Sequence, residues 1–156
     1  MNAALEWRGR RVMGLDVGDR WIGVALSDPG GVLATPLTII DRIAQRDYLE
    51  AILEIARERD VARVVVGLPR AMDGTIRQQA EKVLEFVRRL SDKTAVPIEF
   101  RDERLSTVSA GRLMHESGGK RQRKKVRDDA AAAAVILQSF LDEMRQRADD
   151  SEGSVT

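Results

Sequence analysis

The stretch from Gly14 to Asp28, which reads GLDVGDRWIGVALSD, constrains the fold of this chain more than any other. Two apolar runs flank a short segment that contains Gly18 and Asp19, a pattern typical of a β-hairpin. Asp16 stands at the end of the first run, although aspartate has poor strand propensity and its buried charge needs a partner. Asp16 is therefore a candidate ligand for a cation. The alternative is a carboxylate that only caps the turn, a role that Asp19 could equally have.

Composition limits the chemistry that such a ligand can serve. The chain has 156 residues, which suits one domain with a sizeable core. It contains no cysteine and one histidine, His115, so disulfides, thiolate nucleophiles and multi-histidine zinc sites are excluded. A metal would be held mainly by oxygen ligands, which favours Mg²⁺ or Mn²⁺. The formal net charge is only +1, so binding of nucleic acid would need a local basic patch.

The beginning of the chain predicts a three-stranded antiparallel meander. The strands are expected at 11–17, 21–28 and 32–37, with the turn signal Pro29-Gly30-Gly31 between the last two. Pro36 interrupts the third strand and favours an edge position, because proline cannot donate a ladder hydrogen bond.

The pattern then changes to alternating helices and strands. Apolar residues at i, i+3, i+4 and i+7 predict an amphipathic helix over 45–59, and the Val-rich run 62–68 predicts a strand buried on both faces. The remaining elements are a helix capped by Thr75, a strand at 96–100, a helix from Ser106 or Thr107 to Glu116, and a final helix from about Asp128 to Arg147. The alanine-rich start of the final helix predicts close packing against the sheet. The fold class is therefore α/β, with a mixed five-stranded sheet (an antiparallel meander, then parallel strands) flanked by helices.

The ends of the chain are expected to lie outside this core. Residues 1–9 form a loose leader and 148–156 a polar tail, so we expect both to be disordered around a single domain within 1–156. No apolar run approaches the ~20 residues that span a bilayer, and the N-terminal segment lacks the apolar core of a signal peptide. We expect a cytoplasmic protein without a membrane partner.

Acidic residues stand where the predicted strands and the final helix meet. Sites in open α/β sheets lie beyond the carboxyl ends of parallel strands, where Asp16 and Glu103 would come together. The start of the final helix, with Asp128 and Asp129, would need to pack near the same edge. Carboxylates gathered there suit Mg²⁺ ions that activate water and stabilise the leaving oxygen in phosphodiester hydrolysis.

Separate roles follow from these positions. Asp16 could bridge two ions, Glu103 could hold one of them, and Asp129 or Asp128 the other. Two other interpretations stay open. Asp128 and Asp129 could simply cap the helix, whose dipole favours negative charge there, and Glu103 could form a surface ion pair.

Six of the eight residues from Lys120 to Arg127 are basic, in a predicted loop just before the final helix. A solvated loop is one interpretation, but adjacent cations without acidic neighbours repel one another and favour a polyanionic partner. We therefore expect this loop to grip phosphates. The predicted nucleic-acid contacts are Arg104, Lys120, Arg121, Arg123, Lys124, Lys125 and Arg127. The aromatic residues Trp7, Trp21 and Tyr48 are too scattered along the chain to indicate base stacking.

Taken together, four ordered segments resemble the YqgF/RuvX family: GLDVGDRWIGVALSD, VVVGLPRAMDG, RDERLSTVSA and KRQRKKVRDDAAAAAVILQSF. The resemblance covers most of the chain, from about Val12 to Leu141. Proteins of that family are described as Holliday junction resolvases and as nucleases that mature the 5′ end of pre-16S ribosomal RNA. The resemblance implies an RNase H-like fold, nuclease activity, and acidic site residues at Asp16, Glu103 and Asp129.

The chain departs from the family pattern at two positions. Trp21 stands before Ile22 where the family usually has a basic residue, and the single aspartate at the helix start is doubled as Asp128 and Asp129. Counting back along the helix selects Asp129, and counting forward from the basic run selects Asp128. We prefer Asp129, because helix register fixes direction better than a loop does.

The predicted function is a Mg²⁺- or Mn²⁺-dependent endonuclease that acts on structured nucleic acid, either branched DNA or precursor ribosomal RNA. A branched DNA substrate would favour a homodimer, because two symmetric nicks need two sites related by a two-fold axis. One alternative is a non-catalytic nucleic-acid-binding module, which would gain nothing from carboxylates that repel phosphate. Another is a nucleotide-binding ATPase-like domain, which would need a second lobe that 156 residues do not provide.

Overall fold

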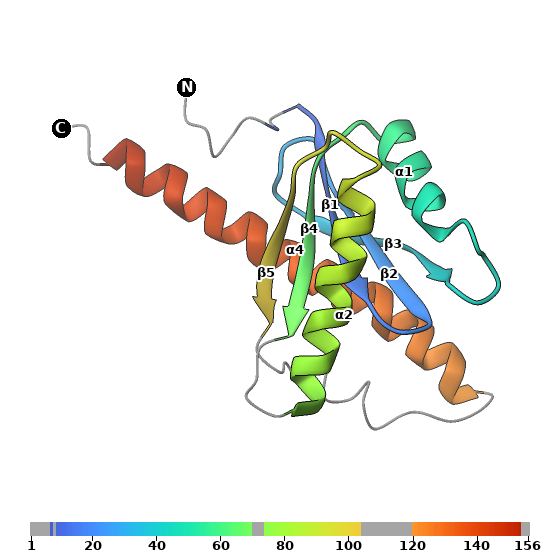
Figure 1. Ribbon diagram of the computed structural model, residues 1–156. Helices are drawn as coiled ribbons and strands as arrows, with labels where there is room; N and C mark the ends of the chain where they lie inside the picture. Colours follow the sequence, from blue (N-terminus) through green and yellow to red (C-terminus); the bar gives the residue numbers. More distant parts are fainter. Residues whose placement is uncertain (1–6, 8, 70–73, 104–119, 154–156) are drawn as a thin grey trace.

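The computed structural model describes residues 7, 9–69, 74–103 and 120–153, which form one sheet with helices on both faces (Figure 1). In chain order the elements are β1 (Arg11–Val17), β2 (Trp21–Ser27), β3 (Ala34–Asp41), α1 (Tyr48–Glu58), β4 (Val61–Pro69), α2 (Gly74–Ser91), β5 (Ile98–Glu103) and α4 (Lys120–Gly153). Within these ranges, no helix is long and apolar enough to cross a membrane.

The five strands form a mixed sheet in the order β3-β2-β1-β4-β5. Antiparallel pairs join β1 to β2 and β2 to β3, whereas parallel pairs join β1 to β4 and β4 to β5. The predicted meander followed by parallel strands is therefore confirmed. Because β1, β4 and β5 run the same way, their carboxyl ends lie at one edge of the sheet, at the bottom of Figure 1. We call this edge the carboxyl edge.

Alternation along β1 gives the sheet two different faces. Leu15 lies in a buried apolar cluster with residues of α1 and α2. Val12 packs on the other face, in a second cluster with residues of α4. Gly14 and Asp16 share that second face with Val12, since every other residue of a strand points the same way. Asp16 therefore lies on the α4 face of the central strand.

β3 lies at the edge of the sheet, as the proline predicted. Pro36 pairs with Ala25 at the point where the register between the two strands shifts, so its missing N–H is tolerated. The strand runs from Ala34 to Asp41 instead of the predicted 32–37. Thr38, Ile39 and Ile40 explain the extension, because β-branched residues favour the ladder.

The final helix, α4, is longer than predicted at both ends. It begins at Lys120 and not near Asp128, so the basic run 120–127 is helical and the predicted loop is wrong. Lys, Arg and Gln are strong helix formers and no Gly or Pro interrupts the run, so propensity outweighs repulsion between adjacent cations. The helix continues to Gly153, so 148–153 are helical rather than part of a disordered tail.

The expectation that residues 1–9 form a disordered leader is wrong at Trp7. Its indole is buried, and its ring centroid lies 5.6 Å from that of Phe140 on α4. The amphipathic helix predicted from 45 begins at Tyr48, and the strand predicted at 96–100 runs from Ile98 to Glu103. The helix expected at 106–116, with His115, lies outside the described residues.

Candidate active site

Two buried carboxylates stand out on the α4 face. Among the residues whose side chains are described, Asp16 and Asp129 are the buried charged ones, with exposed fractions of 3% and 2%. One comes from β1 and the other from α4, so distant parts of the sequence supply them. Burial of an ionised carboxylate is unfavourable unless charge or hydrogen bonds compensate it. Apolar packing alone therefore gives no reason for acids at these two positions.

Gly23 brings the two carboxylate residues to the same place. It is the antiparallel partner of Asp16 in the β1–β2 ladder, where paired Cα atoms lie about 4.5–5.5 Å apart. The backbone of Asp129 rests directly on this glycine. A Cβ atom on Gly23 would lie 2.6 Å from the Asp129 carbonyl carbon, and closer still to the carbonyl oxygen. Asp16 and Asp129 are thus neighbours across a position where a Cβ atom would clash with the helix backbone.

Gly14 is a second strand residue on which α4 packs closely. A Cβ atom on Gly14 would lie 2.7 Å from the Cβ of Leu137 and 2.9 Å from the carbonyl oxygen of Ala133. The predicted close packing of the alanine-rich helix against the sheet is confirmed. Because strand glycines let the helix approach so closely, they set the depth at which α4 presents its buried acid.

Polar contacts fix α4 along the sheet. Gln138 accepts the N–H of Ala34 at 2.9 Å and donates to the carbonyl of Val32 at 2.8 Å. At the far side of the sheet, Arg101 of β5 pairs with Glu143 of α4. The hydrogen bond from that guanidinium lowers the pKa of the Glu143 carboxyl from its ordinary value. Contacts on both sides of the sheet therefore oppose sliding of the helix.

The other predicted site residues are described only in their backbone or not at all. Glu103 is the last residue of β5, in register with Pro69, at the carboxyl edge. Asp128 and the basic run 120–127 belong to the first turns of α4, and Arg104 lies outside the described residues. Among the described side chains, no three of His, Cys, Asp and Glu gather to hold a metal ion. The structure thus brings Asp16 and Asp129 together and puts the backbone of Glu103 at the same edge of the sheet.

The pair formed by Asp16 and Asp129 has the donor chemistry of a magnesium or manganese site. Both donors are hard carboxylate oxygens, and Mg²⁺ commonly takes one or two carboxylates together with water and substrate phosphate oxygens. Two acids buried beside one Gly also repel each other, which a divalent cation would relieve. The residues present therefore fit such an ion.

Arg42 supports the turn that follows Asp16. It donates to the carbonyl of Gly18 at 2.8 Å and to the hydroxyl of Tyr48 at 3.3 Å. Arg89 of α2 donates to the same hydroxyl at 2.9 Å. Burial alone would raise the pKa of Tyr48, but the hydrogen bonds from the two guanidinium groups outweigh it and lower that pKa. Sequence reasoning missed this cluster, because no local motif links positions 42, 48 and 89.

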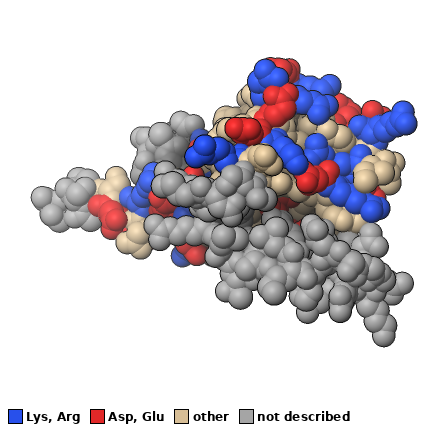
Figure 2. All heavy atoms as spheres, turned by 60° about the horizontal axis from the view of Figure 1, so that its bottom comes forward, with Lys and Arg blue, Asp and Glu red and all other residues tan. Residues whose placement is uncertain are grey.

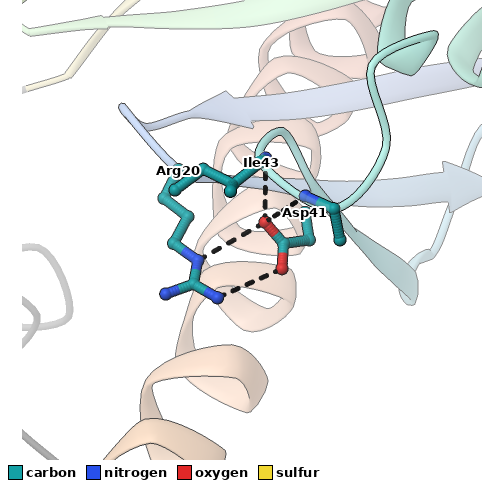
Figure 3. A network of polar contacts seen from close by, with 4 residues as sticks. Arg20, Asp41 and Ile43 are labelled. Carbon is teal, nitrogen blue, oxygen red and sulfur yellow. Dashed lines mark hydrogen bonds and ion pairs between the residues drawn. The ribbon is translucent and has the colours of Figure 1, made fainter.

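A second network lies beside the same turn (Figure 3). Asp41, the last residue of β3, accepts the N–H groups of Ile43 at 3.0 Å and Ala44 at 3.3 Å. Its carboxylate also binds Arg20 through two contacts of 3.4 and 3.3 Å, and the hydrogen bond from Arg20 lowers the pKa of Asp41. The Arg20 guanidinium lies 4.6 Å from the ring centroid of Trp21. The network therefore fixes Arg20 over the indole.

Figure 2 looks onto the carboxyl edge. Much of this view is taken up by residues that are not described, and on the described surface beside them Lys and Arg side chains alternate with Asp and Glu side chains. Some of these cations pair with acids, as Lys82 does with Asp19 at 3.2 Å, and both partners are largely exposed. Exposed ion pairs are weak and exchange readily. The described surface in this view is therefore of mixed charge, in line with a formal net charge of +1 for the whole chain.

The sequence matches known proteins over most of its length. Residues 10–143 match the family model described as "RuvX: Holliday junction resolvase". A protein of Moorella thermoacetica is 47% identical over 136 residues, which cover 87% of this chain and 97% of that protein. A protein of Roseiflexus sp. is 48% identical over 135 residues, which cover 86% of this chain and 96% of that protein. Both carry the name "Putative pre-16S rRNA nuclease".

Two solved structures share the fold. T. thermophilus RuvC in complex with a Holliday junction substrate aligns with a TM-score of 0.53 and 16% identity, over 86% of this chain and 96% of that chain. Fowlpox virus resolvase in complex with Holliday junction DNA aligns with a TM-score of 0.51 and 10% identity, over 86% and 98%. At these identities the likeness concerns the fold alone. The RNase H-like fold that the resemblance implied is confirmed.

Proposed function

The chain belongs to the RuvX family, and from this membership we propose that it is an endonuclease that hydrolyses phosphodiester bonds in structured nucleic acid. The observation that carries the proposal is the pair of buried carboxylate residues, Asp16 and Asp129, that meet across Gly23. A protein that only bound nucleic acid would gain nothing from acids there, since they repel phosphate. The pair therefore favours hydrolysis over a non-catalytic binding module.

In this proposal Asp16 and Asp129 hold Mg²⁺ or Mn²⁺, and Glu103 is a third ligand. Such ions, when bound, activate water and neutralise charge that develops on the phosphate. β1 holds Asp16 within a rigid sheet, and Gly23 sets the depth at which α4 delivers its acid. We prefer Asp129 to Asp128 as the helix ligand, because the backbone of Asp129 is the one seated on the glycine.

The first two turns of α4 and Arg104 would contact the phosphate backbone in this proposal. Six of the eight residues from Lys120 to Arg127 are basic, and they lead directly into the proposed ligand Asp129. Because this segment is helical, its backbone has a regular spacing relative to that ligand. Phosphates bound there would be held at a defined distance from the carboxylates.

Precursor 16S ribosomal RNA is the first candidate substrate, because relatives that are 47% and 48% identical carry that substrate in their names. Such a role would place the protein in the cytoplasm, where ribosomes mature. A four-way DNA junction is the second candidate, because the family description names it. The junction would call for a homodimer, since two symmetric nicks need two sites in a two-fold arrangement.

Cleavage of a precursor 16S RNA fragment and of a four-way DNA junction, each with Mg²⁺ and then Mn²⁺, tests the proposal. Asp16→Asn and Asp129→Asn remove a ligand charge with little change in volume, so each should abolish cleavage and preserve binding. Asp19→Asn is the matched control, because its carboxylate lies on the same hairpin but is 68% exposed, and this variant should keep full activity. Full cleavage by Asp16→Asn would refute the site. Loss of cleavage in Asp128→Asn but not in Asp129→Asn would assign the helix ligand to Asp128 instead of Asp129.

The two substrates separate the two biological roles. RNA cleavage that depends on Asp16 would identify a nuclease of ribosomal RNA maturation, and junction cleavage that depends on it would identify a resolvase. If the unaltered protein cuts neither substrate with either metal, the enzyme proposal fails and a binding module takes its place.

A further inference from the structure

Trp21 begins β2 on the face that carries the two buried carboxylates. Ala25 packs toward α4 and Gly23 lies under Asp129, so alternation along β2 puts Trp21 on the same face, two residues nearer to the hairpin turn. Its register partner on β3 is Asp41. The ring is half-buried and belongs to neither of the two buried apolar clusters. Trp21 therefore lies at the rim of the proposed site without being a core residue.

Arg20 is held over this ring before any ligand arrives. Asp41 takes two backbone N–H groups and has only 21% of its side chain exposed, so it is a fixed acid. It binds Arg20 at two points (Figure 3). The guanidinium carbon of Arg20 lies 4.6 Å from the ring centroid of Trp21. The Arg20 side chain is 45% exposed. The result is a preformed stack of indole and guanidinium with an outer surface open to solvent.

A similar pair elsewhere in the chain shows what a purely structural stack looks like. Near the amino ends of the parallel strands, Arg63 lies over Trp7 with 5.5 Å between its guanidinium carbon and the ring centroid. That indole is buried and packs against Phe140 in the core. The stack at the carboxyl edge stays open instead. Indole rings and guanidinium planes are the groups on which proteins stack unpaired nucleobases.

We propose that the stack of Arg20 and Trp21 binds an unpaired nucleobase next to the phosphate that lies at Asp16 and Asp129. This inference rests on the proposed nuclease function and narrows its substrate class. In a continuous duplex both faces of every base are covered by neighbouring bases, so only a base in a loop, branch or single-stranded end can join the stack. The site therefore selects nucleic acid that is unpaired beside the point of cleavage.

Binding measured without divalent ions separates this stacking from cleavage. The probe is a duplex with a short unpaired bulge, made in DNA and in RNA, and its matched partner carries abasic sugars in the same bulge. Both probes offer the same phosphates, so the difference in their affinities reports base stacking. Trp21→Leu should weaken binding of the base-bearing probe by roughly 5- to 150-fold, the range for one stacked base, and leave the abasic probe unchanged. Trp21→Phe keeps a ring and should retain most of the difference.

Arg63→Gln is the matched control, because it removes the same type of contact at the opposite end of the sheet and should leave both affinities unchanged. Equal weakening of both probes by Trp21→Leu, or no weakening of either, would overturn the inference. So would an unaltered protein that binds the two probes equally, a result that needs no variant to fold. Cleavage of the base-bearing probe with Mg²⁺ is measured in parallel. A stacking difference without cleavage would refute only the nuclease, and cleavage without a stacking difference would refute only the stack.

Discussion

Gly23 is the position at which one added methyl group should disturb catalysis more than stability. A Cβ atom there would lie 2.6 Å from the carbonyl carbon of Asp129 and 3.1 Å from the nitrogen of Ala130. Both are backbone atoms of a helix, so neither can rotate away. Ordinary contact begins at 3.4 Å, so Gly23→Ala requires α4 to move outward by about 1 Å.

Two magnitudes follow from that displacement. Overpacking of a well-filled interior costs roughly 1–3 kcal/mol of the free energy of unfolding. Misplacement of a catalytic group by about 1 Å can slow a reaction about 100-fold. We expect Gly23→Ala to stay folded at low temperature, to lose stability within that range, and to cleave about 100-fold more slowly. Its affinity for substrate should change little, because the variant keeps every basic residue in the first turns of α4.

Gly14→Ala is the matched control for this variant. Its Cβ would lie 2.7 Å from the Cβ of Leu137 and 2.9 Å from the carbonyl oxygen of Ala133, further along the same helix. It should cost similar stability while it displaces Asp129 less. Urea unfolding gives the free energy of unfolding, and single-turnover cleavage at low temperature gives the rate. Unchanged cleavage by Gly23→Ala, or equal slowing by both variants, would refute the idea that Gly23 sets the position of the helix acid.

Two further predictions concern charge. Replacement of Lys124 and Lys125 by Ala should weaken nucleic-acid binding and reduce its salt dependence by roughly one to two phosphate contacts. The same change at Arg59 and Lys93, which precede β4 and β5 at the opposite edge of the sheet, should leave both unchanged. A salt dependence of binding in the Lys124 and Lys125 variant equal to that of the unaltered protein would show that the start of α4 is not part of the interface. The pKa of Asp41 is lowered by the hydrogen bond of its ion pair, so its contribution to stability is present above the pKa of the unfolded carboxyl and is lost as pH falls through the folded pKa. Urea unfolding should show this loss below about pH 4, and Asp41→Asn should reduce it; identical pH profiles would contradict the assignment.

The strands, and the meander followed by parallel strands, could be predicted because their signals are local. Alternation, turn residues and the Val-rich run mark β1, β2 and β4 at nearly their observed bounds, and Pro36 marks the edge strand. Asp16 could be singled out for the same reason. An acid at the end of an apolar strand is a local anomaly, and function is a frequent cause of such anomalies.

The start of α4 could not be predicted with the same certainty, because two local effects oppose each other there. Repulsion within the run 120–127 argued for a loop, and helix propensity argued for a helix that continues into Asp128 and Asp129. The contacts of Arg42, Tyr48 and Arg89 are a different case. They join three separate segments, and nothing in the spacing of those residues predicts that their side chains meet.

The meeting of Asp16 and Asp129 depends on residues that carry no chemistry. The sequence supplies both acids, but only the absence of side chains at Gly14 and Gly23 lets α4 come close enough to bring them together. The hydrogen bonds of Gln138 then fix the position of the helix along the sheet. The glycines set the distance of Asp129 from the sheet, and these polar contacts set its position along the helix axis. Two like charges buried in this way oppose folding unless a cation or hydrogen bonds compensate them. Close packing of α4 on Gly14 and Gly23 is therefore required for the site as well as for the fold, and the two glycines are as necessary to the site as the two acids.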